Sequence, residues 1–261
     1  MLNNSTINAH LTEAAQRVCV ALEIFPCIDS TNSYLMTHAQ NNAPSGSVCF
    51  AEEQTAGKGR RGRQWISPQG QNIYGSFLWR FSGVAELGGL SLAIGVGVIR
   101  VLRQQGFANV GLKWPNDIYS NGKKLGGILI EVTSHTDGSA SAIIGLGLNF
   151  NLPPNLDGIT QAYTNLCEVA PSVALERNFM VAQLLNELLP IAATFEDQAL
   201  AAYLDEWRDY DCLFGKAVNL FVGSQQISGI VQGIDENGLL KLQRDDGTIQ
   251  TFASGEVSFS A

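Results

Sequence analysis

Residues 57–63 combine four cations with three glycines in the sequence GKGRRGR. The chain has 261 residues and a formal net charge of −8, so this loop is strongly basic in an otherwise acidic protein. Glycine lets a backbone adopt positive φ and approach a ligand closely, and arginine binds phosphate or carboxylate through two parallel hydrogen bonds. The pattern predicts a flexible loop that closes over a small molecule carrying a phosphate.

The loop also matches the G-x-G-x-x-G pattern of dinucleotide-binding proteins, but its flanks exclude that function. The pattern requires a helix that begins at the glycines and an acidic residue about 20 positions further on. Here Pro68 and Gly70 follow instead, and residues 76–82 contain no acid. No G-K-[ST] ends the loop, so it is not a P-loop. A solvated basic turn is the remaining alternative, and interleaved glycines and cations make it the weaker one.

A second candidate motif is K-W-P-N-D at residues 113–117. Pro115 restricts the preceding residue to extended conformations, so the motif predicts a turn between two strands. Asp117 is a candidate Mg²⁺ ligand, because Mg²⁺ binds one or two carboxylates and keeps several waters. Alternatively, Asn116 and Asp117 only satisfy backbone groups of the turn, and the motif alone leaves both interpretations open.

Two further motifs are glycine-containing strands, KKLGGIL at residues 123–129 and GLGLNF at residues 145–150. Lys124 followed by paired glycines indicates close approach to a ligand, although a lysine also protects an edge strand from aggregation. Alternate glycines leave one face of the second strand bare, so a flat ligand could lie there and Asn149 could bind a base edge. Packing against a bulky neighbour is the alternative.

The predicted helices and strands that position these motifs form an α+β pattern. Candidate strands lie at residues 23–28, 48–52, 72–81, 111–114, 117–120, 124–133 and 140–150. Candidate helices lie at residues 9–22, 30–39, 84–105, 175–195 and 198–210. Asn121-Gly122 predicts a hairpin turn between two of the strands.

After Tyr210 the sequence changes to short strand-like segments joined by Gly223-Ser224, Asn237-Gly238 and Asp246-Gly247. This pattern is typical of an all-β meander that forms a small barrel. We therefore predict one domain over residues 1–212 and a second over residues 213–261.

Composition narrows the classes of function. A pI near 4.9 argues against a broad surface for nucleic acid or membrane lipid, since both require a basic face. Five scattered cysteines without a C-x-x-C pair predict reduced thiols in a cytoplasmic protein. Three histidines lack metal-ligand spacing, so no zinc site is expected. The apolar run at residues 87–99 is shorter than the roughly 20 residues that span a bilayer, and it predicts a buried helix.

Together with Asp29-Ser30-Thr31-Asn32, the four motifs resemble those of the biotin–protein ligases, enzymes that attach biotin to biotin carboxyl carrier domains. The resemblance covers nearly the whole chain from about Ile24, and the basic loop followed by K-W-P-N-D is highly specific. It implies a mixed sheet backed by helices, as in the class II synthetase and biotin ligase catalytic domains, followed by a small SH3-like β-barrel domain.

The resemblance also implies a reaction in two steps. The carboxylate of biotin attacks the α-phosphate of ATP, which gives biotinyl-5′-AMP and pyrophosphate. A lysine of the carrier domain then attacks the acyl group and releases AMP. Arg60 and Lys124 are implied to neutralise the carboxylate and the α-phosphate in the first step, and Asp117 to assist the metal or the acceptor lysine.

The resemblance assigns two overlapping sets of binding residues. The implied biotin-binding residues are Ser30, Thr31, Asn32, Gln54, Gly57, Lys58, Gly59, Arg60, Lys124, Gly127, Gly145 and Gly147. The implied ATP-binding residues are Lys58, Arg60, Arg61, Arg63, Trp65 and Asn149, with Trp65 over the adenine face and Asn149 bonded to the adenine. Mg²⁺ is expected with ATP, and Asp117 is its candidate ligand.

The sequence departs from the pattern of the biotin–protein ligases in two places. Lys58 stands where the family often has arginine, so it keeps the charge but loses the bidentate fork. Some members carry an N-terminal helix-turn-helix module, which needs about three helices, whereas only 23 residues precede Ile24. We expect no DNA binding and no membrane association, a carboxylase carrier domain as the partner, and a monomer or homodimer in the cytoplasm.

The sequence leaves two alternatives to a biotin–protein ligase. A lipoate–protein ligase shares the fold and the adenylation chemistry, but its substrate lacks a ureido ring and the G-x-G-R-x-G loop argues against it. A non-catalytic sensor of biotin or adenylate could act by dimerising through exposed sheet surface. Lys124 and Arg60 favour catalysis over this second alternative.

Overall fold

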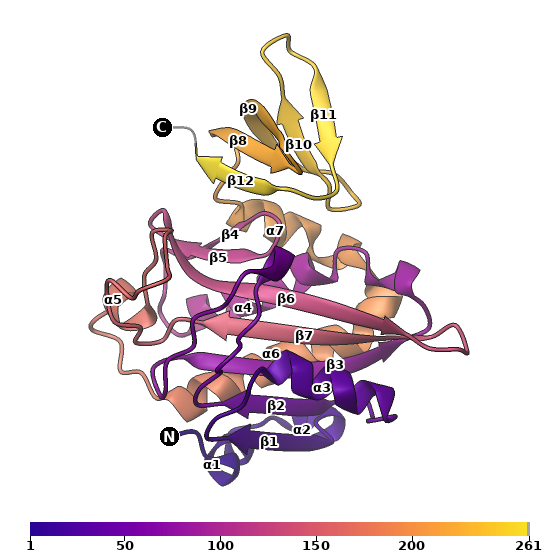
Figure 1. Cartoon of the computed structure of the whole chain (residues 1–261), viewed down its shortest axis with the longest axis vertical. Coiled ribbons are helices and arrows are strands. Elements are labelled where there is room, and N and C mark those ends of the chain that lie inside the picture. The colour runs from indigo at the N-terminus through magenta and orange to yellow at the C-terminus, as the bar shows by residue number, and fades with distance from the viewer. Residues whose placement is uncertain (260–261) are drawn as a thin grey trace.

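A seven-stranded mixed sheet is the centre of the computed structural model, which describes residues 1–259 (Figure 1). The strand order is β1-β2-β3-β7-β6-β5-β4, with β1 parallel to β2 and the other neighbours antiparallel. The strands are β1 (Ala21–Phe25), β2 (Ser47–Ala51), β3 (Ile73–Phe81), β4 (Gly111–Lys113), β5 (Asp117–Ser120), β6 (Lys123–Ser134) and β7 (Ala140–Leu148). The predicted mixed sheet is confirmed.

The middle of the sheet is formed by its longest strands. β3 and β7 pair over nine residues, from Ile73 opposite Leu148 to Phe81 opposite Ala140. β7 is buried at nearly every position, which fits its near-continuous apolar sequence. The Asn121-Gly122 turn joins β5 to β6, and both residues have positive φ, as a tight hairpin requires.

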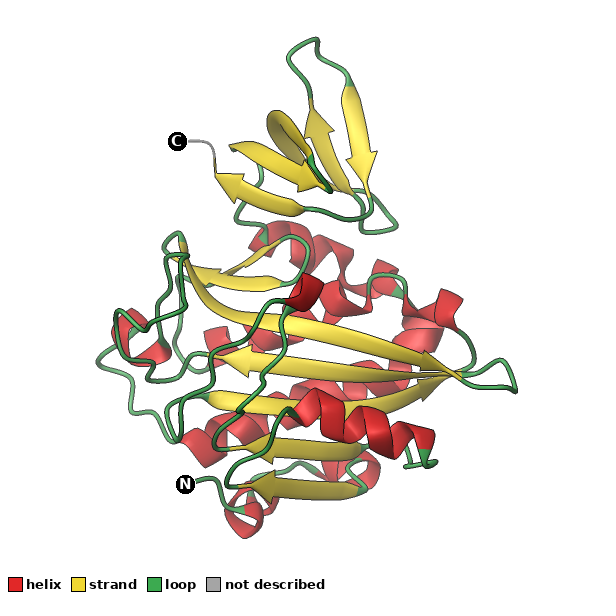
Figure 2. Cartoon of the chain, in the orientation of Figure 1, coloured by secondary structure: helices red, strands yellow, loops and turns green. Residues whose placement is uncertain are grey.

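Helices cover both faces of this sheet (Figure 2). α4 (Leu90–Gln104) and α6 (Arg177–Gln198) pack on one face, and α3 (Thr31–Gln40) lies across the other. The segment Val84–Gln104, which ends with α4, is long and apolar enough to cross a membrane by composition, but α4 itself is buried against the sheet and α6. Its apolar sequence is therefore explained by the protein core.

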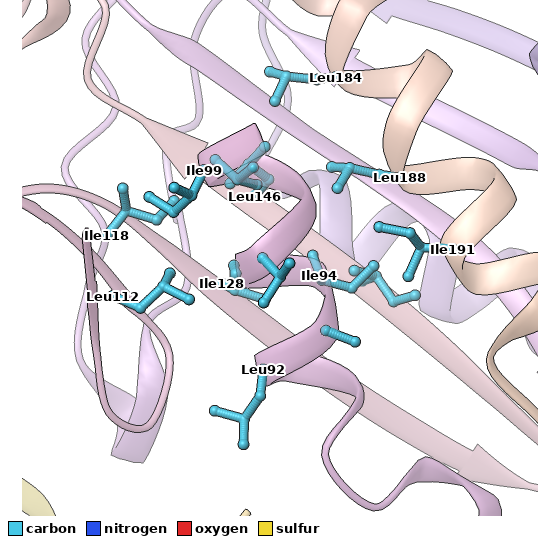
Figure 3. Close-up of a cluster of buried hydrophobic side chains, with 14 of the residues drawn as sticks. Leu92, Ile94, Ile99, Leu112, Ile118, Ile128, Leu146, Leu184, Leu188 and Ile191 are labelled. Carbon is cyan, nitrogen blue, oxygen red and sulfur yellow. The ribbon is translucent and has the colours of Figure 1, made fainter. Parts of the chain in front are cut away.

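Two glycines let α4 fit between its neighbours. A Cβ on Gly97 would lie 2.6 Å from Ile191 Cδ1 of α6, and one on Gly95 would lie 3.0 Å from Leu112 Cδ2 of the sheet. Figure 3 shows the resulting cluster, in which side chains of α4 meet those of the sheet and of α6. Close approach of this kind gives the interior its dense packing.

The predicted helix over residues 9–22 is wrong. Two short helices, α1 (Asn4–Ala9) and α2 (Glu13–Val18), occupy this region, and β1 begins at Ala21. Thr12 starts the second helix, because its side chain accepts a hydrogen bond from the backbone N–H of Ala15. Leu22, which falls within the predicted helix, instead pairs with Val48 in the sheet.

Residues with positive φ mark the ends of two further helices. Gly89, at φ +78°, separates η2 (Val84–Leu87) from α4. Ala199, at φ +51°, ends α6, and η3 (Leu200–Tyr203) and α7 (Leu204–Tyr210) follow it. Positive φ cannot continue a right-handed helix, so the helix predicted over residues 84–105 is divided at Gly89, whereas the predicted break between residues 195 and 198 is found at Ala199. A further short helix, α5 (Leu166–Val169), lies in the expected loop region.

The C-terminal strands form a separate antiparallel sheet with the order β11-β10-β9-β8-β12. The strands are β8 (Ala217–Val222), β9 (Gln225–Ile234), β10 (Leu240–Gln243), β11 (Ile249–Phe252) and β12 (Glu256–Phe259). The three predicted turns lie between successive strands. The predicted small β domain is confirmed, but within residues 1–259 its edge strands β11 and β12 do not pair, so the expected SH3-like barrel is not closed.

The two sheets meet at the end of α7, and we propose a domain boundary between Cys212 and Leu213. Leu112 and Asp211 form a bridge that ties this segment to β4. Trp114 also crosses the boundary, since its indole Nε1 donates to the carbonyl of Gly238 at 3.0 Å. Figure 1 shows the second sheet stacked beyond the β4–β5 edge of the first.

Asp211 is a largely buried acid at this junction. Its Oδ1 accepts a hydrogen bond from the backbone N–H of Leu213 at 2.8 Å, whereas Oδ2 has no partner among the described residues. Burial raises the pKa of the Asp211 carboxyl to about 6. The folded state therefore favours the protonated form, which costs stability as the group ionises.

We expect Asp211→Asn to stabilise the protein more at pH 7 than at pH 4. A raised carboxyl pKa gives stability that is complete below the unfolded pKa near 4 and is lost as pH rises through about 6. The variant has no carboxyl group to ionise at this position. Its free energy of unfolding, relative to that of the unmodified protein, should therefore rise by up to about 3 kcal/mol between pH 4 and pH 7. Urea unfolding at several pH values measures it, with the exposed Asp209→Asn as control. An advantage that does not change with pH would contradict this assignment.

Candidate active site

A cavity of about 270 Å³ lies on the α3 side of the large sheet, and it is lined by residues of both sheets. It brings together most of the residues singled out from the sequence. These are Ser30, Thr31, Asn32, Gln54, Lys58, Gly59, Arg60, Arg63, Trp65, Asp117, Lys124, Gly127, Gly145 and Gly147. Gly57, Arg61 and Asn149 were also singled out, but they do not line it.

The basic loop is a narrow, hydrogen-bonded hairpin that crosses the sheet (Figure 1). The backbone N–H of Gly59 donates to the carbonyl of Arg63 at 2.7 Å, and that of Trp65 donates to the carbonyl of Gly57 at 2.8 Å. The turn itself, η1 (Arg60–Gly62), has positive φ at Arg61 and Gly62. Gly57 is needed for close approach, because a Cβ there would lie 2.4 Å from the carbonyl oxygen of Trp65.

Three of the four loop cations contact three different parts of the protein. Lys58 Nζ lies 3.3 Å from a carboxylate oxygen of Glu131 on β6. Arg60 donates to the side-chain oxygen of Asn116 at 2.9 Å. Arg63 pairs with Glu256 of β12, so the loop also touches the second sheet. Among the described residues Arg61 forms no ion pair, and it is exposed.

Arg60 is held by a neutral amide and has no carboxylate at bonding distance among residues 1–259. Burial, and then the neighbouring Arg61, lower the pKa of its guanidinium. The direction of this shift shows that the positive charge is incompletely compensated by the protein. An anion in the cavity would supply the missing compensation.

A second group of charges surrounds Asp117. Its Oδ1 lies 2.8 Å from Lys124 Nζ, and its Oδ2 lies 4.0 Å from Lys113 Nζ. Burial lowers the pKa of the Lys113 ammonium, against the opposite effect of Asp117, and Lys124 lowers it further. With Arg60, this end of the cavity therefore contains three cations and one anion, which favours an anionic ligand.

The same geometry gives no support to Asp117 as a Mg²⁺ ligand. Two ammonium groups flank its carboxylate, and they would repel a divalent cation. No group of three or more His, Cys, Asp or Glu residues within residues 1–259 is arranged to hold a metal. Lys113 was not predicted as a site residue, although its position in the K-W-P-N-D motif is a signal for it.

Asn116 was interpreted only as a turn residue, but it orients Arg60. Its side-chain Nδ2 donates to the carbonyl of Ile128 at 2.6 Å, and the backbone N–H of Ile128 donates to its carbonyl at 2.9 Å. These bonds fix the Asn116 side-chain oxygen, which then accepts from Arg60. The turn thus links the basic loop to β6.

The glycine-bearing strand β7 is not bare. A Cβ on Gly145 would lie 2.2 Å from Asn32 Oδ1, and a Cβ on Gly147 would lie 2.5 Å from Trp65 Cε2. The packing alternative therefore holds at both glycines, since side chains of the protein occupy the two positions. The indole Nε1 of Trp65 is buried without a partner among the described residues.

The opposite end of the cavity is polar and mostly uncharged. Ser30 is the N-cap of α3, and the buried Thr31 and Asn32 form its first turn. The backbone N–H of Thr31 donates to Gln54 Oε1 at 2.9 Å, and Gln54 Nε2 donates to Ser67 Oγ at 3.0 Å. These side chains present several convergent donors and acceptors, as a specific site for a small polar group requires.

The second sheet contributes residues that the sequence did not indicate. Phe221 of β8, Gly255 just before β12, and Glu256, Val257 and Ser258 of β12 line the cavity. Nothing in their local pattern marks them as site residues, because only the packing of the two sheets brings them there. Asn149, by contrast, is beside the site, where its Nδ2 donates to the carbonyl of Thr164 at 3.0 Å.

Comparison with known proteins identifies relatives over most of the chain. Residues 24–149 match the Biotin/lipoate A/B protein ligase family, and residues 213–260 match the Biotin protein ligase C terminal domain. The Bifunctional ligase/repressor BirA of Escherichia coli is 41% identical over 240 residues, which cover 91% of this chain and 74% of that protein. The Biotin--[acetyl-CoA-carboxylase] ligase of Mycobacterium tuberculosis is 33% identical, over 90% of this chain and 88% of that protein.

Solved structures of biotin protein ligases also resemble this chain. The biotin protein ligase from Aquifex aeolicus in complex with biotin and ATP superposes with a TM-score of 0.78 at 28% identity. The match covers 92% of this chain and 99% of that one.

We expect Gly147→Ala to loosen the basic loop. The added methyl group would overlap the Trp65 indole, and overpacking of this kind costs about 1–3 kcal/mol. Displacing the indole releases the end of the loop, so trypsin should cleave the folded protein at residues 58–63 several-fold faster. Gly83→Ala is the matched control, because a Cβ there has no neighbour closer than 3.9 Å. Equal cleavage rates in the two variants would contradict the packing role of Gly147.

Proposed function

This chain belongs to the biotin/lipoate A/B protein ligase family, and we propose from its site that it activates biotin with ATP and transfers it to a carrier-domain lysine. The sequence resemblance to biotin–protein ligases is confirmed. The single observation that carries the proposal is one cavity with a cationic end and a polar, neutral end. Biotin has the same division, with a carboxylate on its tail and a ureido ring.

The first step joins two anions, the biotin carboxylate and the α-phosphate of ATP. Arg60 and Lys124 lie at the cationic end, where incompletely compensated positive charge lowers the energy of bringing them together. Asn116 fixes the direction of Arg60, so the site supplies alignment as well as charge. When Lys124 turns to the ligand, the ammonium group of Lys113 remains beside the Asp117 carboxylate.

The second step requires a neutral amine on the carrier lysine. Asp117 is the carboxylate beside the reacting groups, and we propose that it receives the proton of that lysine as the amine attacks the acyl group. AMP leaves with the electrons of the broken anhydride bond. The basic loop covers the adenylate meanwhile and keeps water from it.

The ureido ring is proposed to bind Ser30, Thr31 and Gln54, since these groups converge at the neutral end. ATP is proposed to contact Lys58, Arg61 and Arg63 through its phosphates and Trp65 through its adenine. Asn149 keeps only its side-chain oxygen for the adenine amino group, because its Nδ2 binds backbone carbonyls. Mg²⁺ would enter with the ATP phosphates as part of that substrate, and no step is assigned to a protein-held ion.

The acceptor is a carrier domain of a biotin-dependent carboxylase, in keeping with relatives named as ligases of acetyl-CoA carboxylase. We propose that this acidic chain does not bind DNA and that it acts in the cytoplasm as a monomer or homodimer. Its net charge of −8 disfavours contact with a polyanion.

Incubation of the purified protein with biotin, MgATP and a carrier domain tests the proposal. Mass spectrometry should show one biotinyl group added to one lysine of the acceptor, with AMP and pyrophosphate formed in equal amounts. Lipoate in place of biotin should give no transfer. Transfer of lipoate only would indicate a lipoate ligase, and binding of biotin without any transfer would indicate a sensor.

We expect Arg60→Gly to release biotinyl-5′-AMP into solution. Loss of one charge-assisted contact of about 1.5–3 kcal/mol weakens retention roughly ten- to hundredfold. Free adenylate acylates exposed lysines, so labelling of a bystander protein should rise by a similar factor. The exposed Arg17→Gly variant is the control. If Arg60→Gly still labels only the carrier lysine, Arg60 does not retain the adenylate.

A further inference from the structure

Glu131 on β6 lies at the end of a chain of hydrogen bonds under the basic loop. One of its carboxylate oxygens accepts from Asn32 Nδ2 at 2.9 Å, and the other accepts from Lys58 Nζ at 3.3 Å. Glu131 does not line the cavity, and no role follows for it from the motifs of the sequence. Asn32 does line it, so Glu131 contacts the site through that amide.

The two contacts of Glu131 differ in strength. The Lys58 side chain is 41% exposed, and ion pairs of that kind contribute little because solvent screens them. Asn32 is buried, with 4% of its surface exposed, and its bond to a carboxylate is charge-assisted. The orientation of Asn32 is therefore the main consequence of Glu131.

The chain continues through two buried hydroxyl groups. Ser76 Oγ lies 2.6 Å from Asn32 Oδ1 and 2.7 Å from Thr31 Oγ1. A carboxylate only accepts, so Asn32 must direct its NH₂ group at Glu131 and its oxygen at Ser76. Ser76 must then donate to Asn32, and Thr31 must donate to Ser76. Two longer contacts compete with this chain, since Asn32 Nδ2 lies 3.4 Å from the carbonyl of Leu129 and Thr31 Oγ1 lies 3.2 Å from Gln54 Oε1. The shorter bonds to Glu131 and Ser76 set the direction of the protons.

This assignment decides what the neutral end of the cavity offers a ligand. The hydroxyl proton of Thr31 is used, so Thr31 Oγ1 can only accept from a group in the cavity. Gln54 accepts the backbone N–H of Thr31 and gives one proton to Ser67, which leaves its second N–H as a donor. A ureido ring has N–H donors and a carbonyl acceptor, and it matches this pattern.

We propose that Glu131 is a positioning residue that fixes the donor and acceptor pattern of the ureido end of the site. The inference rests on the proposed function, because it assumes biotin as the ligand. A neutral glutamine at this position could donate as well as accept. The side-chain amide of Asn32 could then rotate by 180°, and its NH₂ group would donate to Ser76. Ser76 would in turn donate to Thr31, and the hydroxyl proton of Thr31 would point at a ureido N–H.

Calorimetric titration of Glu131→Gln with biotin and with iminobiotin tests the proposal. Iminobiotin has a guanidine in place of the urea, and a ring nitrogen of the neutral guanidine can accept as well as donate. It can therefore face Thr31 whether that hydroxyl accepts or donates, whereas biotin requires an acceptor, and the ratio of the two Kd values reports this difference. We expect Glu131→Gln to bind biotin about tenfold more weakly and to lose most of its preference over iminobiotin. The KM for biotin should rise while kcat at saturating biotin changes little.

Two conservative variants complete the experiment. Glu131→Asp keeps an acceptor-only carboxylate and should retain the preference for biotin. Ser76→Ala removes a link of the chain without touching Glu131, and it should reproduce the loss of preference. Ser141→Ala is its matched control. Ser141 is also buried on a strand of the sheet, but it bonds to His135 and takes no part in the hydrogen bonds that link Glu131 to Thr31.

The outcomes separate this inference from the proposed function. If the unmodified protein does not bind biotin, both are wrong. If it binds biotin and Glu131→Gln keeps the original ratio of Kd values, the inference alone is overturned. Should Glu131→Gln fail to fold by circular dichroism, Ser76→Ala decides: an unchanged ratio in that variant overturns the chain of hydrogen bonds.

Discussion

Electrostatic repulsion between two anions is the constraint on which this site depends. A carboxylate and a phosphate must be brought into contact by a protein whose own net charge is −8. Cations are needed, but they must not be neutralised by nearby acids. The structure meets this need by giving Arg60 a neutral amide as its partner and by placing Lys113 and Lys124 around one carboxylate, Asp117. The excess positive charge remains available to the ligand.

The scaffold keeps this charge in place through contacts that are largely uncharged. The K-W-P-N-D turn is bonded to β6 by Asn116 and to the second sheet by Trp114. Behind the sheet, the glycines of α4 allow close packing against α6, so the strands below the cavity are supported from the far side (Figure 3). A dense apolar layer resists displacement, and the polar groups above it therefore keep their geometry.

The glycines of β7 have a different use from the one that their pattern suggests. Gly145 and Gly147 make room for Asn32 and Trp65, and both glycines also line the cavity. One of these side chains belongs to the neutral end of the cavity and the other to the end of the basic loop. A single strand therefore seats both the polar recognition group and the loop that covers the reaction.

The sequence by itself determined the chemistry and most of the elements. Strongly local signals, such as the Asn121-Gly122 turn and the strands predicted at residues 72–81 and 140–150, depend mainly on neighbouring residues, and these predictions are confirmed. The division of the first helix did not follow from periodicity, because Leu22 suits a helix face and a strand equally until Val48 pairs with it. Sequence resemblance supplied the family, and comparison with relatives confirmed it.

Only the tertiary structure decided which groups share the cavity and how their protons are arranged. Glu256 reaches the loop from 193 positions further along the chain, and Glu131 reaches Asn32 across 99 positions, so no local pattern could indicate either contact. Asn116 gained its role in the same way, through a bond to Arg60 that the turn alone does not imply. The physical reason is common to all three. Sequence sets what each side chain can donate, accept or neutralise, whereas the partner that uses this capacity is chosen by the packing of distant strands.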